Sequence, residues 1–548
     1  MNANQTVFEY LIKKLYDYGV RHVFGVPGDY ALGFFHELEL SNLEVVNTCD
    51  EQGAGFAADA YARVNGLGVV CVTYSVGSLK VANSTAQAFA EKSPVIVISG
   101  APGVKERLEN PLLHHKVGSF DTQLKVFEQL TVASTIINDA EIAGKEIDRV
   151  LSAAIRNKQP VYIELPRDMG TEIVTPYKTS LVFDQNTDKN VLKEALVEAV
   201  TIINSSKKPV ILAGVEIHRF GFQKLLLKII EKTNIPIACT LLGKTVISEN
   251  HPRFLGIYEG AMGREDVKDY VESSDCLILL GTFMTDINLG IYTAHLEKGS
   301  SIYVTSEKIS IHYHTFENIQ MEEFLQGFLN SDLKFHKTNN IPHPIHPVQT
   351  KPIKGKNVSV SYLFQSLNWF LDDNTIVITD PGDAMFGAVD MTIHKAAEFL
   401  APAYYASLGF AVPASIGTQL IKPKLRPLVL VGDGAFQMTG MELSTSVRYG
   451  LNPIIVVLNN EGYGTERPML DGRFNDVLLW DFCQIPKLLN SGLSFNIKTE
   501  DQLEDALDEV KKYTKSFCIL DVHLDPHDSS MALQRLTKAL GKRISKSM

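Results

Sequence analysis

The sequence lacks the marks of several common protein classes. None of its six cysteines stands in Cys-x-x-Cys spacing with another, so neither a zinc ribbon nor a redox dithiol is expected. Several lie in apolar runs, and we expect buried, reduced thiols. No apolar run reaches 18 residues, so no membrane-spanning helix is expected. The N-terminus has no apolar core of signal-peptide length, and the simplest location is the cytoplasm.

Positive charge is also in deficit. Asp and Glu number 63 against 52 Lys and Arg, which gives a formal net charge of −11. This balance argues against a protein whose main task is binding nucleic acid. The first strand turn, Gly25–Gly28, lacks the Gly-x-Gly-x-x-Gly spacing of a dinucleotide-binding turn. A nicotinamide-dependent dehydrogenase, which a general α/β pattern would suggest, is therefore disfavoured.

Short apolar, β-branched runs alternate with helix-like stretches along the chain. This alternation is typical of parallel sheets covered by helices. The runs fall into three groups, separated by a polar stretch at 171–190 and a proline-rich one at 341–347. We therefore predict an α/β protein with three domains, each a parallel sheet flanked by helices, over residues 1–180, 190–335 and 355–548.

Two strand ends in the third domain carry residues suited to a metal and a phosphate. Gly432-Asp433-Gly434 and Asn459-Asn460 each follow an apolar run directly. Ligands of parallel α/β domains bind beyond the carboxyl ends of the strands, and glycines let backbone N–H groups approach a phosphate. Asp433 is a hard oxygen ligand for Mg²⁺, to which Asn460 and the Gly462 carbonyl can add. Alone, Gly-Asp-Gly is usually a turn; the second strand end makes the pattern specific.

This combination resembles the cofactor motif of the thiamine-diphosphate enzymes. The resemblance implies thiamine diphosphate and Mg²⁺ as cofactors, with Asp433, Asn460 and the Gly462 carbonyl as metal ligands. It also implies that Leu408 supports the bent cofactor. The implied cofactor contacts in the third domain are Gly382, Asp383, Leu408, Gly434, Ala435, Asn460, Gly462 and Tyr463. The implied folds are thiamine-diphosphate-binding domains at both ends and a Rossmann-like middle domain.

The first domain narrows the resemblance to the pyruvate and indolepyruvate decarboxylases. The segments Phe24–Tyr30 and Thr73–Gly77 and the pair His114-His115 are similar to segments of that family. The resemblance implies that Glu51 contacts the aminopyrimidine ring of the cofactor and that Ser75 also binds the cofactor.

The resemblance further implies a set of proton-transfer residues. These are Asp29, His114, His115 and Glu466. Plainer interpretations exist for each first-domain residue: Asp29 as a turn residue, Glu51 as a helix cap and the histidines as surface residues. The occurrence of the whole set in the family's order and spacing favours the catalytic interpretation.

The implied reaction is the non-oxidative decarboxylation of a 2-oxo acid to an aldehyde and CO₂. Cleaving a carbon–carbon bond beside a carboxylate needs an electron sink that side chains do not provide, so a cofactor carries it. We expect Met385, Phe386 and Thr465 to line the substrate pocket. Pyruvate decarboxylases carry tryptophan at the position of Met385, and methionine is thinner. A branched-chain or aromatic 2-oxo acid is therefore favoured over pyruvate.

Three alternatives stay open. The protein could be a pyruvate decarboxylase proper, an acetolactate-synthase-like carboligase, or an inactive structural member of the family. A carboligase would not need His114-His115. The expected partner is the 2-oxo acid, with no nucleic acid and no membrane. The resemblance also implies a homodimer or homotetramer, with each active site at the interface between the first domain of one chain and the third domain of another.

Overall fold

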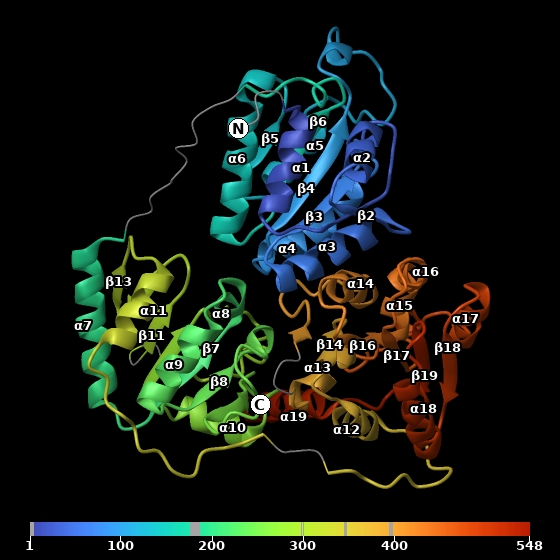
Figure 1. Cartoon of the computed structure of the whole chain (residues 1–548). Helices are drawn as coiled ribbons and strands as arrows, with labels where there is room; N and C mark the ends of the chain where they lie inside the picture. The colour runs from blue at the N-terminus through green and yellow to red at the C-terminus, as the bar shows by residue number, and fades with distance from the viewer. Residues whose placement is uncertain are drawn as a thin grey trace.

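The computed structural model describes residues 5–175, 187–297, 299, 301–344, 348–393 and 398–547, with only the backbone for 540–547. The described residues form three sheets covered by helices, which confirms the predicted α/β class (Figure 1). Both expected connectors lie between sheets, although 176–186 and 345–347 fall outside the described residues. The domain boundaries themselves stay a prediction.

The first domain is a parallel sheet in the order β2-β1-β3-β4-β6-β5. Its central strands are wholly buried, as helices on both faces require. The strands are β1 (His22–Gly25), β2 (Glu44–Asn47), β3 (Gly68–Val72), β4 (Val95–Ala101), β5 (Ser134–Ile136) and β6 (Val161–Pro166). The helices are α1 (Val7–Asp17), α2 (Leu32–Glu39), α3 (Glu51–Asn65), α4 (Ala82–Ala90), α5 (Thr122–Glu128) and α6 (Ala140–Asn157).

The third domain repeats the strand order of the first. Its order is β15-β14-β16-β17-β19-β18, so in both domains the second strand lies at one edge and the fifth at the other. The strands are β14 (Thr375–Thr379), β15 (Phe399–Leu400), β16 (Arg426–Gly432), β17 (Ile454–Asn459), β18 (Leu493–Ile497) and β19 (Cys518–His523). The helices are α12 (Val360–Phe370), α13 (Asp383–Gly387), α14 (Ala411–Ile421), α15 (Asp433–Thr439), α16 (Leu443–Arg448), α17 (Ile485–Leu488), α18 (Glu500–Lys512) and α19 (Met531–Ser547).

The middle sheet corrects the expectation of wholly parallel sheets. Its order is β13-β12-β11-β10-β7-β8-β9, and β12 pairs antiparallel with both β11 and β13. The connections between these three strands are too short for a parallel crossover. The strands are β7 (Pro209–Ala213), β8 (Ile237–Cys239), β9 (Phe254–Ile257), β10 (Cys276–Leu280), β11 (Ser301–Val304), β12 (Ile309–Ile311) and β13 (His314–Phe316). The helices are α7 (Lys189–Ser205), α8 (Val215–Arg219), α9 (Gln223–Thr233), α10 (Glu265–Glu272) and α11 (Met321–Asn330).

Helices α3 and α14 join the first and third domains, and lie against each other in Figure 1. Each follows the second strand of its sheet, so the domains dock through equivalent helices. Asp50 caps α3 by accepting the N–H of Gln52 at 2.8 Å. The helices approach so closely that a Cβ at Gly417 would lie 2.0 Å from the carbonyl oxygen of Ala57. Glycine is therefore required at this crossing.

A buried ion pair fixes the middle domain to the third. Lys244 Nζ lies 2.8 Å from Glu249 Oε1 and donates a hydrogen bond to the Met391 carbonyl at 2.7 Å. The Glu249 carboxylate accepts the N–H of Ile393 at 2.7 Å. Removing either charge would leave the other buried and unpaired, which is strongly destabilising. The segment that follows α13 and the short turn η5 (Ala388–Asp390) is thus held by the middle domain.

The cysteines are free, and four of the six are buried as expected. Cys49 is exposed and Cys483 is half-buried, so the expectation of buried thiols is wrong for Cys49. Cys49 lies in the loop before α3, where its thiol donates to the Met441 carbonyl rather than entering a core. Within the described residues, no helix is both long enough and apolar enough to cross a bilayer.

Candidate active site

Asp433 is a buried carboxylate at the end of β16. One oxygen accepts the N–H of Gly434 at 2.7 Å and the other accepts the N–H of Gly462 at 3.1 Å. Its exposed fraction is 1%, and burial raises the pKa of Asp433 to about 6. No basic side chain among the described residues forms an ion pair with it. The site therefore offers negative charge to a cation that the chain does not supply.

The loop after β17 lies beside Asp433 because β16 and β17 are parallel neighbours, with Gly432 in register with Leu458. Asn459 has a structural role, since its amide donates to Asp521 Oδ1 at 2.8 Å. The Tyr463 ring covers Gly434, where a Cβ would lie 2.8 Å from a ring carbon. The strand ends thus bring Asp433, Gly434, Gly462 and Tyr463 together.

The loop at the end of β14 is the predicted diphosphate contact. Gly382 has φ +97°, which favours glycine, and its nearest side chain is that of Thr465. The Asp383 carboxylate accepts the N–H of Ser530 at 2.9 Å, at the start of α19, and burial raises the pKa of Asp383 to about 6. Because a carboxylate repels a diphosphate, the contact that fits the prediction is the backbone N–H of Asp383 rather than its side chain.

Asp380 is a buried residue that sequence reasoning did not single out. Its carboxylate accepts three N–H groups, from Gly409 at 2.7 Å, Phe410 at 3.2 Å and Ala411 at 2.9 Å. On the other side, Thr439 Oγ1 donates to the Gly409 carbonyl at 2.7 Å. The segment that carries Leu408 is thus fixed from both β14 and α15. The signal in the sequence was an Asp directly after a strongly apolar strand.

The first domain brings Asp29, His114 and His115 together. His114 Nε2 lies 2.7 Å from Asp29 Oδ2, and His115 Nε2 lies 4.0 Å from Asp29 Oδ1. The ring of Tyr30 stacks on His114 with centroids 4.8 Å apart, and its hydroxyl lies 3.4 Å from His114 Nδ1. Sequence reasoning missed Tyr30 as a partner, although it is adjacent to Asp29.

Glu51 and Ser75 occupy different settings. Asp50, not Glu51, caps α3, so the interpretation of Glu51 as a helix cap is wrong. The Glu51 carboxylate instead lies 2.8 Å from Lys80 Nζ. Ser75 is buried with φ 58°, and its N–H donates to Gln123 at 2.8 Å. The N–H of Ser75 is therefore already engaged within the first domain.

The two sets of residues are separate in one chain. Figure 1 places the segment between β4 and α5, which contains the histidine pair, at the end of the first domain remote from the third. Among the described residues, no hydrogen bond or ion pair joins Asp29, His114 or His115 to the third domain. Glu466 is exposed, and within the described part of the chain its hydrogen bonds are those of its backbone. In one chain, Asp29, His114 and His115 thus lie apart from the third-domain residues of the predicted site.

Comparisons with known proteins decide the family. Three models of the thiamine pyrophosphate enzymes match the chain: the N-terminal TPP binding domain over residues 5–125, the central domain over 196–330 and the C-terminal TPP binding domain over 382–522. The chain is 34% identical to an indole-3-pyruvate decarboxylase of Azospirillum brasilense, over 91% of this chain and 92% of the relative.

Two further relatives are also named as decarboxylases. The chain is 30% identical to pyruvate decarboxylase 3 of Arabidopsis thaliana, over 96% of this chain and 92% of the relative. It is 31% identical to an alpha-keto-acid decarboxylase of Mycolicibacterium paratuberculosis, over 95% of this chain and 94% of the relative. The chain belongs to the thiamine-diphosphate-dependent 2-oxo acid decarboxylases. These decarboxylases are carboxy-lyases, and each of the three matched models falls on a different one of the three sheets.

The residues of this decarboxylase fit a magnesium-bound cofactor. Asp433 is buried without a cation, and the Asn460 side-chain oxygen accepts no hydrogen bond from any described residue. The Gly462 carbonyl accepts one hydrogen bond, from Gly464 at 3.0 Å, which leaves a lone pair free. Carboxylate, amide and carbonyl oxygens are the ligands that Mg²⁺ prefers.

The predicted pocket residues of the decarboxylase divide into two groups. Thr465 is half-buried beside Gly382. Met385, with an exposed fraction of 1%, packs into the apolar cluster of the middle domain, and the partly buried Phe386 packs against the same cluster. The Met385 side chain thus faces the middle-domain core in the single chain, and its place in the substrate pocket stays a prediction.

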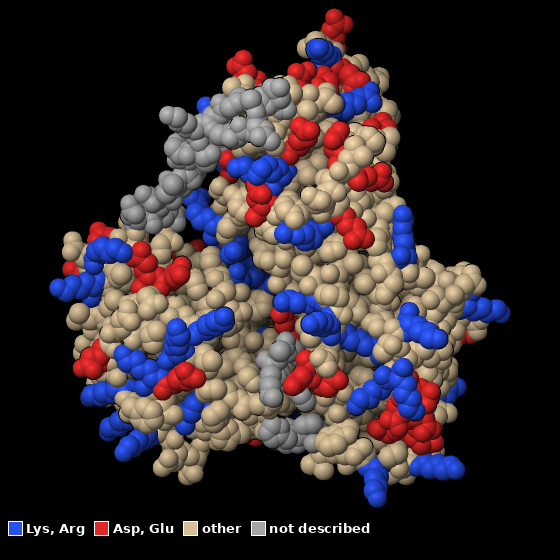
Figure 2. Space-filling view, in the orientation of Figure 1, with Lys and Arg blue, Asp and Glu red and all other residues tan. Residues whose placement is uncertain are grey.

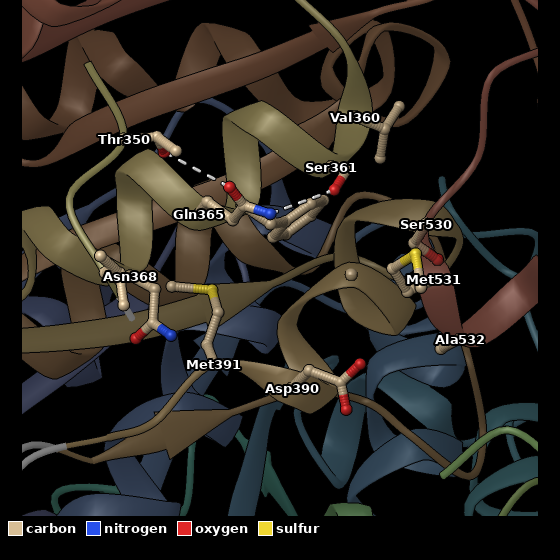
Figure 3. A pocket seen from close by; sticks show the side chains of 13 residues that line it. Thr350, Val360, Ser361, Gln365, Asn368, Asp390, Met391, Ser530, Met531 and Ala532 are labelled. Atoms are coloured by element: carbon tan, nitrogen blue, oxygen red, sulfur yellow. Dashed lines mark hydrogen bonds between the residues drawn. The ribbon is translucent and has the colours of Figure 1, made fainter. Parts of the chain in front are cut away.

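A groove of about 340 Å³ lies elsewhere on the decarboxylase, between α12, η5 and the start of α19 (Figure 3). Its polar side chains include Gln365, which donates to Ser361 at 3.4 Å, and Asn368. None of its lining residues belongs to the predicted site.

Proposed function

We propose that this protein converts a 2-oxo acid to an aldehyde and CO₂, using thiamine diphosphate and Mg²⁺. The observation that carries the proposal is the buried Asp433 carboxylate without a cationic partner, bound by the N–H groups of two glycines at adjacent strand ends. The relatives named as decarboxylases support the reaction class. A cytoplasmic location stays a prediction.

The third domain would hold the cofactor. Mg²⁺ would bind Asp433, the Asn460 side-chain oxygen and the Gly462 carbonyl, and the diphosphate would lie against the backbone of Gly382–Asp383 and Gly434–Ala435. Leu408, held through Gly409 by Asp380 and Thr439, would support the bent cofactor. When bound, the thiazolium ring accepts the electron pair that the departing CO₂ leaves behind.

The first domain would move protons at the reacting carbon. Asp29 and His114 already share a hydrogen bond, and Tyr30 holds the opposite nitrogen of His114. This arrangement fixes the ring so that Nε2 faces the carboxylate. Glu51 would hydrogen-bond the aminopyrimidine, and Glu466 would contribute a second carboxylate from the third domain.

We propose that the complete site forms between two copies of the chain. In one chain the two halves are apart, and both halves border exposed apolar side chains. In the first domain these are Leu32, Leu108, Leu112 and Val117, and in the third Met438, Met469, Leu470, Phe474, Leu478 and Leu479. On the face in Figure 2, the surface over α15 and α16 is largely uncharged. Exposed apolar surface of this extent is typical of protein interfaces.

We further propose a preference for branched-chain or aromatic 2-oxo acids. Met385 packs into the middle-domain cluster, and its side chain is thinner than the tryptophan of strict pyruvate decarboxylases, so a substrate pocket bounded by α13 would be wider with methionine at this position. The relative named as an indole-3-pyruvate decarboxylase is consistent with a large substrate.

One variant tests whether the first domain transfers protons while the third domain binds the cofactor. Asp29→Asn should abolish aldehyde formation, because it removes the carboxylate at the reacting carbon, while thiamine diphosphate binding persists on the third domain. Aldehyde can be followed with a coupled alcohol dehydrogenase and binding by calorimetry with Mg²⁺ present. A folded Asp29→Asn variant with full activity would contradict the proposal.

A further inference from the structure

We propose that Asp29, His114 and His115 form a second metal site that binds a divalent transition-metal ion such as Zn²⁺, and that the bound ion inhibits the enzyme. The inhibition rests on the proposed function, because the same three side chains are assigned to proton transfer. The binding itself depends only on the geometry of the first domain.

The three side chains are spaced as metal ligands. Their nearest ligand atoms all lie within 4.8 Å of one another, and Asp29 lies 2.7 Å from His114 Nε2 and 4.0 Å from His115 Nε2. A tetrahedral Zn²⁺ with bonds of about 2.1 Å places its ligand atoms roughly 3.4 Å apart. The observed distances lie on both sides of that value, so small side-chain rotations suffice to admit the ion.

The backbone directs both rings to the same carboxylate. Successive side chains in extended chain point to opposite sides, yet the rings of His114 and His115 lie with centroids 4.7 Å apart. His115 has φ 67°, a left-handed conformation that is uncommon outside glycine and turns its ring back toward Asp29. This conformation brings the two imidazoles to one point.

Tyr30 supplies an outer contact of the kind that metal-binding histidines use. Its hydroxyl lies 3.4 Å from His114 Nδ1, and its ring stacks on the imidazole. This contact orients the ring and leaves Nε2 facing Asp29, where the metal would bind. The neighbouring Arg167 pairs with Glu106 and so leaves Asp29 to the histidines.

The ligand set selects the class of metal. Two imidazole nitrogens and one carboxylate suit Zn²⁺, Co²⁺, Ni²⁺ or Cu²⁺, whereas Mg²⁺ prefers oxygen ligands. The Asp433 site and this site therefore prefer different ions. In the single chain the Asp29, His114 and His115 side chains are 43%, 59% and 30% exposed, and in the proposed two-chain site they would face the pocket that admits the 2-oxo acid, so an ion in solution can reach them.

The experiment uses the holoenzyme with saturating thiamine diphosphate and excess Mg²⁺. Calorimetry with Zn²⁺ should show one ion bound per chain, and Co²⁺ in its place should give the visible absorption of a low-coordinate site. His114→Gln and His115→Gln should each weaken binding at least tenfold. His314→Gln is the matched control, because the exposed His314 ring contacts a single carboxylate among the described residues, that of Glu198 at 3.1 Å.

Activity gives an independent measurement. In the wild-type holoenzyme, stoichiometric Zn²⁺ should remove at least nine-tenths of the decarboxylation rate, and a chelator with added Mg²⁺ should restore it. Unchanged Zn²⁺ affinity in both histidine variants, or bound Zn²⁺ without inhibition, would overturn the inference. A holoenzyme with Mg²⁺ and without Zn²⁺ that forms no aldehyde, yet binds added Zn²⁺ through these histidines, would instead contradict the proposed function and leave the metal site standing.

Discussion

The Asp380 carboxylate accepts the backbone N–H of Gly409 at 2.7 Å and is fully buried. This contact ties the end of β14, where the diphosphate loop begins, to the residue next to Leu408. Burial raises the pKa of Asp380 to about 7 despite three N–H donors. A polar side chain buried at this desolvation cost and bound by three N–H groups indicates that the geometry of this segment matters to the site.

Asp380→Asn should weaken thiamine diphosphate binding about tenfold. The amide cannot accept all three N–H groups, and an unsatisfied buried donor costs about 1 to 3 kcal/mol. Binding can be measured by calorimetry at constant Mg²⁺. Thr418→Val is the control, since that hydroxyl donates to the Ala414 carbonyl at 2.9 Å within α14. Equal affinity in Asp380→Asn and wild type would refute the positioning role.

The Asp433→Asn substitution should raise the stability of the apoprotein while it removes the binding of the metal. The pKa of Asp433 is about 6 in the folded protein, above its ordinary value of 3.8, so the folded state binds this proton more tightly than the unfolded chain does. The resulting stabilisation is fully present below about pH 4 and is lost as pH rises through 6. The neutral amide escapes that loss. The variant apoprotein should therefore be more stable than wild type at about pH 8, by up to about 3 kcal/mol, with little difference near pH 4.

The same variant should lose the stabilisation that Mg²⁺ and thiamine diphosphate give to wild type, as measured by the midpoint of thermal unfolding. Asp383→Asn is its control, because that buried carboxylate also has a pKa raised to about 6 but contacts Ser530. It should show a similar pH effect and keep the cofactor response. A full cofactor response in Asp433→Asn would rule out Asp433 as the metal ligand.

Mixing two inactive variants tests the shared site. Asp29→Asn damages the first-domain half and Asp433→Asn the third-domain half. Random pairing in dimers should restore about one quarter of the wild-type sites, because half of the dimers are hybrids and each hybrid has one intact site. Co-expression with two affinity tags and an aldehyde assay would measure this. No recovery in purified hybrids would show that each site lies within one chain.

Met385→Trp should shift the substrate preference toward pyruvate. The larger ring would occupy space beside α13, so kcat/KM should fall at least tenfold for phenylpyruvate and less for pyruvate. Because Met385 is buried, overpacking could also destabilise the variant. Met385→Leu conserves volume and should keep the wild-type ratio. A wild-type enzyme that already prefers pyruvate would contradict the wide pocket.

Long apolar strands were predictable, and the edges of the sheets were not. The runs at β3 and β17 are wholly buried and rich in β-branched residues. Strands β2 and β18 lie at sheet edges, where one side is exposed and the apolar run is broken. The residues alone did not reveal the repeated strand order of the first and third domains, because topology can recur without sequence similarity; the shared fold was implied only by the family resemblance.

The contacts of the candidate site were likewise predictable from the sequence only in part. The contact between Asp433 and Gly462 follows from adjacent parallel strands, which spacing alone suggests. The contact of Glu442 with the N–H of Asp50 joins residues 392 positions apart and depends on how α3 docks on α14. No local pattern encodes such docking. The grouping of Asp29 with His114 was likewise inferable only through resemblance.

The most direct test is a mass balance on the purified protein. With thiamine diphosphate and Mg²⁺, a panel of pyruvate, 2-oxoisovalerate, phenylpyruvate and indolepyruvate would be supplied, and CO₂ and aldehyde would be counted. We expect one CO₂ and one aldehyde for each 2-oxo acid consumed, and neither when the cofactor is omitted. Acetolactate in place of aldehyde, or no CO₂ from any substrate, would contradict it.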